Sequence, residues 1–513
     1  MGHEVELKLE VPAKSIAELK RMRSLRRRNG HARDKELVSV YFDTAKHKLR
    51  KHGMSLRVRH IGEERVQTVK ANRQSAAGLF DRHEWEAPIA GDTPDLRAAR
   101  HTALEGLNGK KLTHTLKPVF ETRVHRTVVP LKRNGSRIEL TLDQGQVCLG
   151  RKSTPINEVE LELKRGHAAD LFTVARDLTR RVPARFAVRS KADRGYALLG
   201  DQPIVAVRAQ DIALDARMST GEAFRAIALG YLHHIAADEP ALREQDAEGV
   251  HQMRVGLRRL RAAIAVFSDL VDDEETAHIK GELKWLTAEL GPARDLDVYV
   301  MGNIRPLQRS LPDKRGLDAL QHDLEARRAG AFTRARHAVA SPRYRALMLD
   351  TLAWIEAGQW TISDDELIAA TRRRNARDFA NDELARRARK ARKTARKLAR
   401  LDARGRHKLR IGIKKLRYAA DFFAGLFDGR KARKRLRRFE RQLKALQRSL
   451  GALNDIAVHE RLAGNFVGGH GRKRQRAFAV GLVSGREQSR VVPLREAAVQ
   501  AADRFRKARP FWA

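Results

Sequence analysis

The chain has 513 residues, of which 42% are hydrophobic and 33% are charged. This length predicts two or three domains with real apolar cores. The formal net charge of +41 predicts a polyanionic partner, which would be nucleic acid, an anionic membrane surface or polyphosphate. A single cysteine, Cys148, excludes an internal disulfide, and no apolar run reaches the length of a membrane span. The charged first ten residues do not resemble a secretory signal, so we expect a cytoplasmic protein.

Residues 1–200 alternate charged and apolar side chains with a period of two. Such alternation, with glycine-containing turns between the runs, predicts antiparallel strands. A solvated sheet face would give the same pattern on any single strand. The runs are EVELKLEV at 4–11, SLRVRH at 55–60, HEWEAPI at 83–89, RIELTLD at 137–143 and EVELELK at 158–164.

The charges on these strands are segregated by sign. Glu158, Glu160 and Glu162 follow one another on one face of a strand, whereas another strand offers Arg57 and Arg59. Like charges at this spacing repel each other unless a counterion lies between them. A closed barrel with acidic and basic walls would hold a divalent metal on one wall and phosphates on the other.

Several of these motifs, taken in order, resemble the CYTH domain, the family of triphosphate tunnel metalloenzymes. They are ExExK at 4–8, YFDT at 41–44, LRVR at 56–59, TVK at 68–70 and EVELEL at 158–163. The resemblance implies an eight-stranded antiparallel β tunnel over residues 1–200. It also implies hydrolysis or cyclisation of a triphosphate with Mg²⁺ or Mn²⁺.

The same resemblance implies roles for individual residues. The implied metal ligands are Glu4, Glu6, Glu160 and Glu162. The implied triphosphate-binding cations are Lys8, Arg57, Arg59, Lys70, Arg123 and Lys191. The implied catalytic residues are Glu4, Glu6, Lys8, Glu84, Glu86 and Asp143. Arg123 and Arg126 lie on opposite faces of one strand, so only one can face the lumen unless the strand bulges, and we choose Arg123.

A connector at 201–215 separates this domain from residues 216–513, where the hydrophobic period changes to that of a helix. Two basic helices, at 250–267 and 406–423, match each other position by position. Each carries a stripe beside its apolar seam, formed by His251, Arg254, Arg258 and Arg261 in the first and His407, Arg410, Lys414 and Arg417 in the second. Basic side chains extending from the flank of a helical bundle would explain one such stripe but not its repetition.

Each basic helix is followed by a second shared motif, LGPARD at 290–295 and LGALND at 450–455. The doubled pattern predicts an all-α domain of two pseudo-symmetric bundles whose stripes face one groove. Few aromatic residues accompany the stripes, which favours a ligand made only of phosphates over nucleic acid. This half resembles the CHAD domain, which implies binding of inorganic polyphosphate. The expected fold class is therefore α+β, with a β tunnel followed by a helical domain.

The leading hypothesis is a metal-dependent inorganic triphosphatase whose helical domain binds polyphosphate. One alternative is a non-catalytic protein of polyphosphate granules, and another is a nucleoside or thiamine triphosphatase. A class IV-type adenylate cyclase would use the same tunnel fold, because a fold does not determine its chemistry. With this net charge we also expect non-specific nucleic acid binding at low salt. The sequence predicts no membrane association, and leaves the oligomeric state open.

Overall fold

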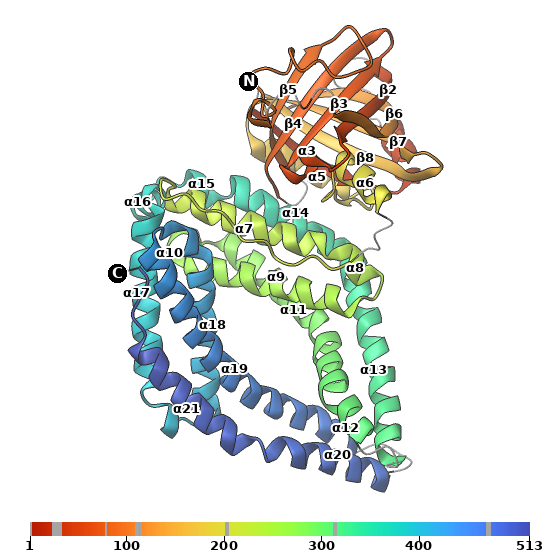
Figure 1. Ribbon diagram of the computed structural model, residues 1–513. Coiled ribbons are helices and arrows are strands. Elements are labelled where there is room, and N and C mark those ends of the chain that lie inside the picture. Colours follow the sequence, from red (N-terminus) through yellow and green to blue (C-terminus); the bar gives the residue numbers. More distant parts are fainter. Residues whose placement is uncertain are drawn as a thin grey trace. The chain divides into compact units, whose positions relative to one another are not determined.

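The structure of the protein is a computed structural model (Figure 1). It divides into two compact units, each of which is treated by itself. The β unit comprises Met1–Val205 and Ala340–Ala357, and the helical unit comprises Ala206–Val339 and Gly358–Ala513. The structure describes residues 3–22, 33–76, 79–107, 112, 115–200, 205–310, 315–467 and 473–512.

Within these residues, eight long strands of the β unit close into one antiparallel barrel. Their order is β5, β4, β3, β2, β6, β7, β8 and β1, and β1 pairs with β5 to complete the ring. The two-residue strand β9 (Arg185–Phe186) adds to β1. The predicted eight-stranded antiparallel tunnel is therefore confirmed, with one additional short strand. The eight strands are β1 (His3–Glu10), β2 (Arg33–Thr44), β3 (Met54–Ile61), β4 (Glu64–Ala76), β5 (Leu79–Pro88), β6 (Leu116–Arg133), β7 (Ser136–Leu149) and β8 (Lys152–Arg165).

The register of the strands sorts apolar and charged side chains onto opposite faces of the sheet. Leu7 of β1 lies opposite Leu161 of β8, and both are fully buried on the outer face of the barrel. Helix α5 (Ala168–Thr179) packs against β8 and helps to cover this face. The next pair, Lys8 and Glu160, points the other way, because successive strand residues alternate between faces. The apolar core therefore surrounds the barrel, and the charges are inside it.

One helix of the β unit comes from much later in the chain. Helix α14 (Pro342–Ala357) packs against α5, and Nε of Arg176 donates a 2.6 Å hydrogen bond to Oδ1 of Asp350 between them. The β unit is thus completed by a segment that lies between the two stretches of sequence forming the helical unit.

The described elements of the second unit are all helices, as predicted, apart from one isolated antiparallel bridge between Ser219 and Asn375 (Figure 1). Its longest helix is α19, and a π-helical stretch, Val300–Ile304, separates α11 from α12. The helices are α7 (Thr220–Ala237), α8 (Glu239–Arg243), α9 (Ala247–Val266), α10 (Ser268–Val271), α11 (Glu274–Tyr299), α12 (Arg305–Ser310), α13 (Arg315–Ala340), α15 (Gln359–Ile362), α16 (Glu366–Arg373), α17 (Ala376–Ala395), α18 (Ala403–Phe423), α19 (Arg430–Val467), α20 (Lys473–Gln488) and α21 (Val491–Lys507).

The two basic helices of the sequence, α9 and α18, pack against each other. The predicted apolar seam of α9 is confirmed, since Met253 and Leu257 are fully buried, and in α18 Ile413 and Leu416 are fully buried as well. Burying both seams brings the flanking basic stripes close together. Across the described residues, no helix combines the length and the hydropathy that crossing a membrane requires.

Candidate active site

The interior of the barrel is a cavity of about 370 Å³ with strongly charged walls. Seven cationic and six carboxylate side chains line it among the described residues. The cations of this lining already pair with its carboxylates. A polyanion can therefore bind only if it replaces carboxylates as the partner of these cations, or if further cations bind together with it. The charged lining residues are Lys8, Arg57, Arg59, Lys70, Arg126, Lys164, Lys191, Glu6, Glu84, Glu86, Glu139, Glu160 and Glu162.

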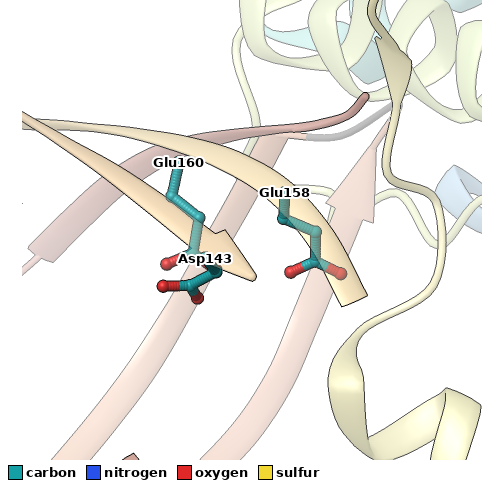
Figure 2. Close-up of side chains that lie close together, drawn as sticks. All are labelled: Asp143, Glu158 and Glu160. Carbon is teal, nitrogen blue, oxygen red and sulfur yellow. The ribbon is translucent and has the colours of Figure 1, made fainter. Parts of the chain in front are cut away.

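Three buried carboxylates lie together at one wall of the barrel (Figure 2). Asp143 of β7 is the register partner of Glu158 of β8, and Glu160 follows two residues later on the same face. One oxygen of each carboxylate lies within 4.8 Å of the others. Carboxylate oxygens are the ligands that Mg²⁺ and Mn²⁺ prefer. We call these three residues the acidic cluster.

The ammonium of Lys191 lies within the acidic cluster. Its Nζ is 2.8 Å from Oδ2 of Asp143, 2.6 Å from Oε2 of Glu158 and 2.8 Å from Oε1 of Glu160. Burial disfavours the charged amine, but the three carboxylates hold the pKa of Lys191 well above its usual value. Burial also opposes ionisation of Glu160, yet Lys191, Lys8 and Arg126 hold the pKa of that carboxyl well below its usual range. The cluster is therefore built to surround a cation.

Arg126 of β6 makes the second strong contact with the acidic cluster, and this corrects the sequence-based choice of Arg123. Nε and Nη2 of Arg126 lie 2.7 Å and 2.6 Å from the two oxygens of Asp143, and Nη2 is also 2.7 Å from Oε2 of Glu160. Arg126 is the register partner of Asp143, so the two share the lumen face. The Arg123 side chain is 63% exposed and pairs with Glu121 outside the lumen.

The opposite part of the wall carries three cations on β3 and β4 and two carboxylates on β5. Nζ of Lys70 lies 2.6 Å from Oε2 of Glu84, and Nη2 of Arg57 lies 3.6 Å from Oε1 of Glu84 and 3.8 Å from Oε1 of Glu86. Burial and the neighbouring Arg57 lower the pKa of Lys70, and the same two causes lower that of Arg59 to about 10. Cations that repel one another in this way favour an anionic ligand between them.

Lys8 of β1 connects the two walls. Its Nζ lies 2.8 Å from Oε1 of Glu160 and 3.0 Å from Oε1 of Glu6. Burial raises the pKa of Glu6, and repulsion from Glu160 adds to this effect despite the adjacent Lys8. Glu162 also lines the lumen. The side chain of Glu4, a predicted metal ligand, falls outside the described residues.

The structure gathers most of the predicted tunnel residues around one cavity, and Asp143 lies buried behind its wall. Their individual roles remain predictions. The sequence analysis did not select Glu158, although it lies two residues before Glu160 and therefore on the same face of the strand. It also did not select Tyr41, which lines the cavity beside Arg57. The predicted residues that line the cavity are Glu6, Lys8, Arg57, Arg59, Lys70, Glu84, Glu86, Glu160, Glu162 and Lys191.

Lys191 reaches the acidic cluster because helix α6 (Lys191–Leu199) is fixed against the barrel. Tyr196 of α6 donates a 2.7 Å hydrogen bond to Oδ2 of Asp43, the buried carboxylate of the YFDT motif. Asp43 also accepts the backbone N–H groups of Leu49 and Arg50, at 2.9 Å and 3.1 Å. The YFDT motif therefore shapes the site through α6 and not by lining it with its own carboxylate.

In the helical unit, the two halves of the repeat form equivalent ion pairs. Nη2 of Arg254 lies 3.9 Å from Oδ1 of Asp295, and Nη2 of Arg410 lies 4.0 Å from Oδ1 of Asp455. The two aspartates end the LGPARD and LGALND motifs. The shared motif thus supplies the same carboxylate to the same arginine in each half. In the second half, Nδ1 of His407 also lies 2.9 Å from Oδ1 of Asn454.

The basic stripes of α9 and α18 meet around Tyr418. Nε of Arg258 on α9 donates a 2.5 Å hydrogen bond to the Tyr418 hydroxyl on α18, and Arg417 lies over the same ring at 5.1 Å. Burial, Arg410 and Arg258 lower the pKa of Lys414 to about 8, which places these three cations together. We define the α9/α18 cation cluster as the following five residues. They are Arg254, Arg258, Arg410, Lys414 and Arg417.

Two other predicted residues behave differently. Arg261 is exposed, and its charge acts on Lys415 beside Arg387, apart from the α9/α18 cation cluster. His251 is half-buried, and burial together with Arg294 lowers its pKa, which favours the neutral imidazole. Tyr418 itself is buried and offers no face on which a nucleic acid base could stack.

Comparison with known proteins identifies both halves. Residues 2–196 match the CYTH domain and residues 226–464 match the CHAD domain. An inorganic triphosphatase of Haemophilus influenzae is 36% identical over 165 residues, which is 32% of this chain and 46% of that protein, so the match spans less than half of that relative. The crystal structure of the CHAD domain from the plant Ricinus communis is 31% identical, covers 58% of this chain and 96% of its own, and superposes with a TM-score of 0.50. The chain therefore belongs to the CHAD family, and its CHAD domain follows an N-terminal CYTH domain.

Proposed function

We propose that the β unit is a metal-dependent triphosphatase whose substrate is inorganic triphosphate. The observation that carries this proposal is the lumen, in which cations of β3 and β4 line the same small cavity as Glu160, with the rest of the acidic cluster buried beside Glu160. Phosphoryl transfer depends mainly on positioning and on neutralising the phosphate charge, and this lumen offers both. The similarity to an enzyme named inorganic triphosphatase favours the same substrate.

The acidic cluster fits a divalent metal. Asp143, Glu158 and Glu160 present three hard oxygens, and the ammonium of Lys191 already occupies the space among them as a cation. Glu4, Glu6 and Glu162 remain further predicted ligands. A bound Mg²⁺ or Mn²⁺ would supply charge neutralisation and a polarised water.

The chain's own cations bind and orient the substrate. Arg57, Lys70 and Arg126 now contact carboxylates, and phosphoryl oxygens of a triphosphate offer them equivalent acceptors. Binding would exchange one set of ion pairs for another, and the carboxylates that lose their cations would be available to a divalent metal. Glu6, whose pKa is raised by burial, is placed beside Lys8 to accept the proton of the attacking water.

A substrate panel tests this function. The full chain is incubated with tripolyphosphate, ATP, thiamine triphosphate and long-chain polyphosphate, each with Mg²⁺, Mn²⁺ or EDTA. We expect metal-dependent phosphate release that is fastest from tripolyphosphate. Faster turnover of ATP or thiamine triphosphate would change the substrate, and cyclic AMP formation would change the reaction class. If no substrate is hydrolysed, the hydrolase proposal is wrong and the alternative of a non-catalytic binding protein is favoured.

We also propose that the helical unit binds polyphosphate through the α9/α18 cation cluster. Its cations come from two packed helices, and burial together with the nearby charge of Arg258 lowers the pKa values of Arg254, Arg410 and Lys414. A chain of phosphates relieves the repulsion between these cations along its whole length. Isothermal titration at near-physiological salt, with polyphosphate and with a DNA duplex of equal total charge, tests the proposal. Equal affinity for polyphosphate and DNA would show that the cluster binds any polyanion without preference.

A further inference from the structure

Helix α19 carries a row of cations on the side opposite its buried face. Phe439, Leu443 and Leu446 are fully buried on one side of the helix. On the other side, cations recur every three or four residues, which places them in one line about 27 Å long. We call this line the α19 ridge. Its members, all exposed, are Arg430, Lys434, Arg437, Arg441, Lys444 and Arg448.

The equivalent helix of the first repeat shows that the fold does not require these cations. Aligning the LGPARD and LGALND motifs places residues 277–290 of α11 on residues 437–450 of α19. Position by position, the two segments have the same pattern of buried, half-buried and exposed residues. The same packing is nevertheless achieved in α11 without the ridge arginines. Where α19 has Arg437, Arg441 and Arg448, α11 has Ala277, Gly281 and Ala288.

The start of α19 also reverses the charge found in α11. At the positions of Asp273, Glu274 and Glu275, α19 has three cations at 433–435. The first turn of α19 contains no acidic residue, although the positive end of the helix dipole favours carboxylates there. Cations one turn apart along the ridge repel one another as well. The ridge is therefore unfavourable for the helix itself, which indicates a role in binding an anion.

Most of the ridge has no carboxylate partner. Nζ of Lys444 lies 3.1 Å from Oε2 of Glu440. Among the described residues, the side chains of the other five members form no ion pair or hydrogen bond. From 430 to 438 the sequence of α19 contains no carboxylate at all.

The ridge leads into the α9/α18 cation cluster. Asp455, which lies 4.0 Å from Nη2 of Arg410, follows Arg448 by two helical turns on the same side of α19. Burial raises the pKa of Asp421 on α18, whereas Arg417 of the cluster and Lys444 of the ridge both lower it. The two packed helices therefore run in opposite directions with the cluster beside the ridge. Asp421, Glu440 and Asp455 offset part of the positive charge at this junction, and the rest of the ridge extends beyond them.

We propose that a long polyphosphate chain leaves the α9/α18 cation cluster along the α19 ridge and not along α11, so that the helical unit prefers long chains to short ones. The inference rests on the proposed polyphosphate binding by the cluster. A single row of cations suits an unbranched row of phosphates, and the ridge has no aromatic side chain on which a nucleic acid base could stack. Arg430 lies about 21 Å beyond Lys444 along the helix, so only a chain that extends past the cluster gains these contacts.

The test is isothermal titration of the full chain with polyphosphates of increasing length, with EDTA present to prevent hydrolysis. The ridge variant combines Arg437→Gln, Arg441→Gln and Arg448→Gln. The matched control combines Arg389→Gln, Lys393→Gln and Arg396→Gln, which removes the same charge from a line of exposed cations at the end of α17. The β unit is identical in all variants, so its contribution cancels in each comparison.

We expect the ridge variant to bind long chains at least about tenfold more weakly than the parent and short chains with nearly the parent affinity. For long chains, the slope of log affinity against log salt should fall by about two, because three contacts of about 0.7 each are lost. The α17 variant should show much smaller changes. Equal losses in the two variants, or a loss that does not depend on chain length, would overturn the proposal, because net charge would then explain the binding.

Two further measurements separate this inference from the proposals on which it depends. Arg410→Gln combined with Lys414→Gln should weaken binding at every chain length. If this cluster variant loses affinity while the ridge variant matches the parent, the cluster proposal stands and the ridge inference fails. An equal loss of affinity for a DNA duplex in the ridge variant would show a general polyanion surface and would also overturn the inference.

Discussion

The hydroxyl of Tyr196 donates a 2.7 Å hydrogen bond to Asp43, a carboxylate buried beneath the start of α3 (Lys48–Lys51). This one contact connects helix α6, which carries Lys191, to the end of strand β2, which is distant in sequence. The position of the Lys191 ammonium within the acidic cluster therefore depends on a residue that does not line the lumen.

Tyr196→Phe should lower both stability and phosphate release. The buried Asp43 loses a donor, which costs about 1–3 kcal/mol, and α6 is less firmly placed. Thermal unfolding and kcat/KM for tripolyphosphate measure the two effects. Tyr231→Phe removes the hydroxyl that accepts a 3.0 Å hydrogen bond from Arg259 in the helical unit, and it should leave kcat/KM unchanged. Full activity in Tyr196→Phe would show that α6 does not need this contact.

Arg126 and Arg123 allow a matched comparison on one strand. Arg126→Lys keeps the positive charge but loses the planar guanidinium, whose N–H groups contact Asp143 and Glu160 at the same time. We therefore expect kcat/KM to fall by about tenfold or more. Arg123→Lys, at an exposed position, should stay near the parent value. Steady-state phosphate release from tripolyphosphate decides between them. A larger loss in Arg123→Lys would mean that the lumen face of β6 has been assigned wrongly.

Metal binding should compete with Lys191, because its ammonium occupies the space among the three carboxylates. Lys191→Gln should therefore raise the affinity for Mn²⁺ in the absence of phosphate by about tenfold or more, since an opposing cation is removed. Isothermal titration of the full chain measures this directly. Lys117→Gln, an exposed change on β6, is the matched control. Unchanged or weaker Mn²⁺ binding in Lys191→Gln would place the metal elsewhere.

The period of the sequence was sufficient to predict strands in residues 1–200 and helices after residue 215, because alternation and helical spacing are local properties. The eight-stranded tunnel and most of its lumen residues were predicted from the resemblance to the CYTH domain. The choice between Arg123 and Arg126 failed for a different reason. Which face of β6 points inward depends on its register against Asp143, seventeen positions later. The place of Lys191 depends on how α6 packs, and the joining of α14 to the β unit depends on contacts that no local pattern contains.

Because α9 and α18 carry matching basic stripes, we expect substitutions on either helix to weaken polyphosphate binding to a similar extent. Replacing Arg254 and Arg258 by Gln should weaken binding about as much as replacing Arg410 and Lys414, because each pair supplies two contacts. The combined variant should lose nearly all affinity and keep its tripolyphosphatase activity. Arg261→Gln, outside the cluster, should have a much smaller effect. Isothermal titration measures the polyphosphate affinity of each variant. Unchanged affinity in both double variants would show that the stripes have a structural role only.

Polyphosphate affinity should also depend on pH through Lys414. Its lowered pKa of about 8 means that the cation is present below this pH and is lost as the pH rises through it. A bound polyanion stabilises the charged form, so affinity should fall between pH 7 and pH 9 by up to about tenfold, the equivalent of one pKa unit. Lys414→Arg should flatten the profile, because arginine stays charged throughout. An equally steep profile in that variant would show that another group titrates.

The closure of the barrel has a consequence for the biosynthesis of the chain. Lys8 on the first strand meets Glu160 on the eighth, 152 positions later. During translation, β1 can pair with β5 early, but its other edge stays unpaired until β8 has left the ribosome. Long-range pairing of this kind is slow, and an open strand edge is prone to associate with other chains. The nascent protein therefore carries an exposed, charged half-barrel while the residues between β5 and β8 are synthesised, and the charges of the future lumen oppose aggregation during that time.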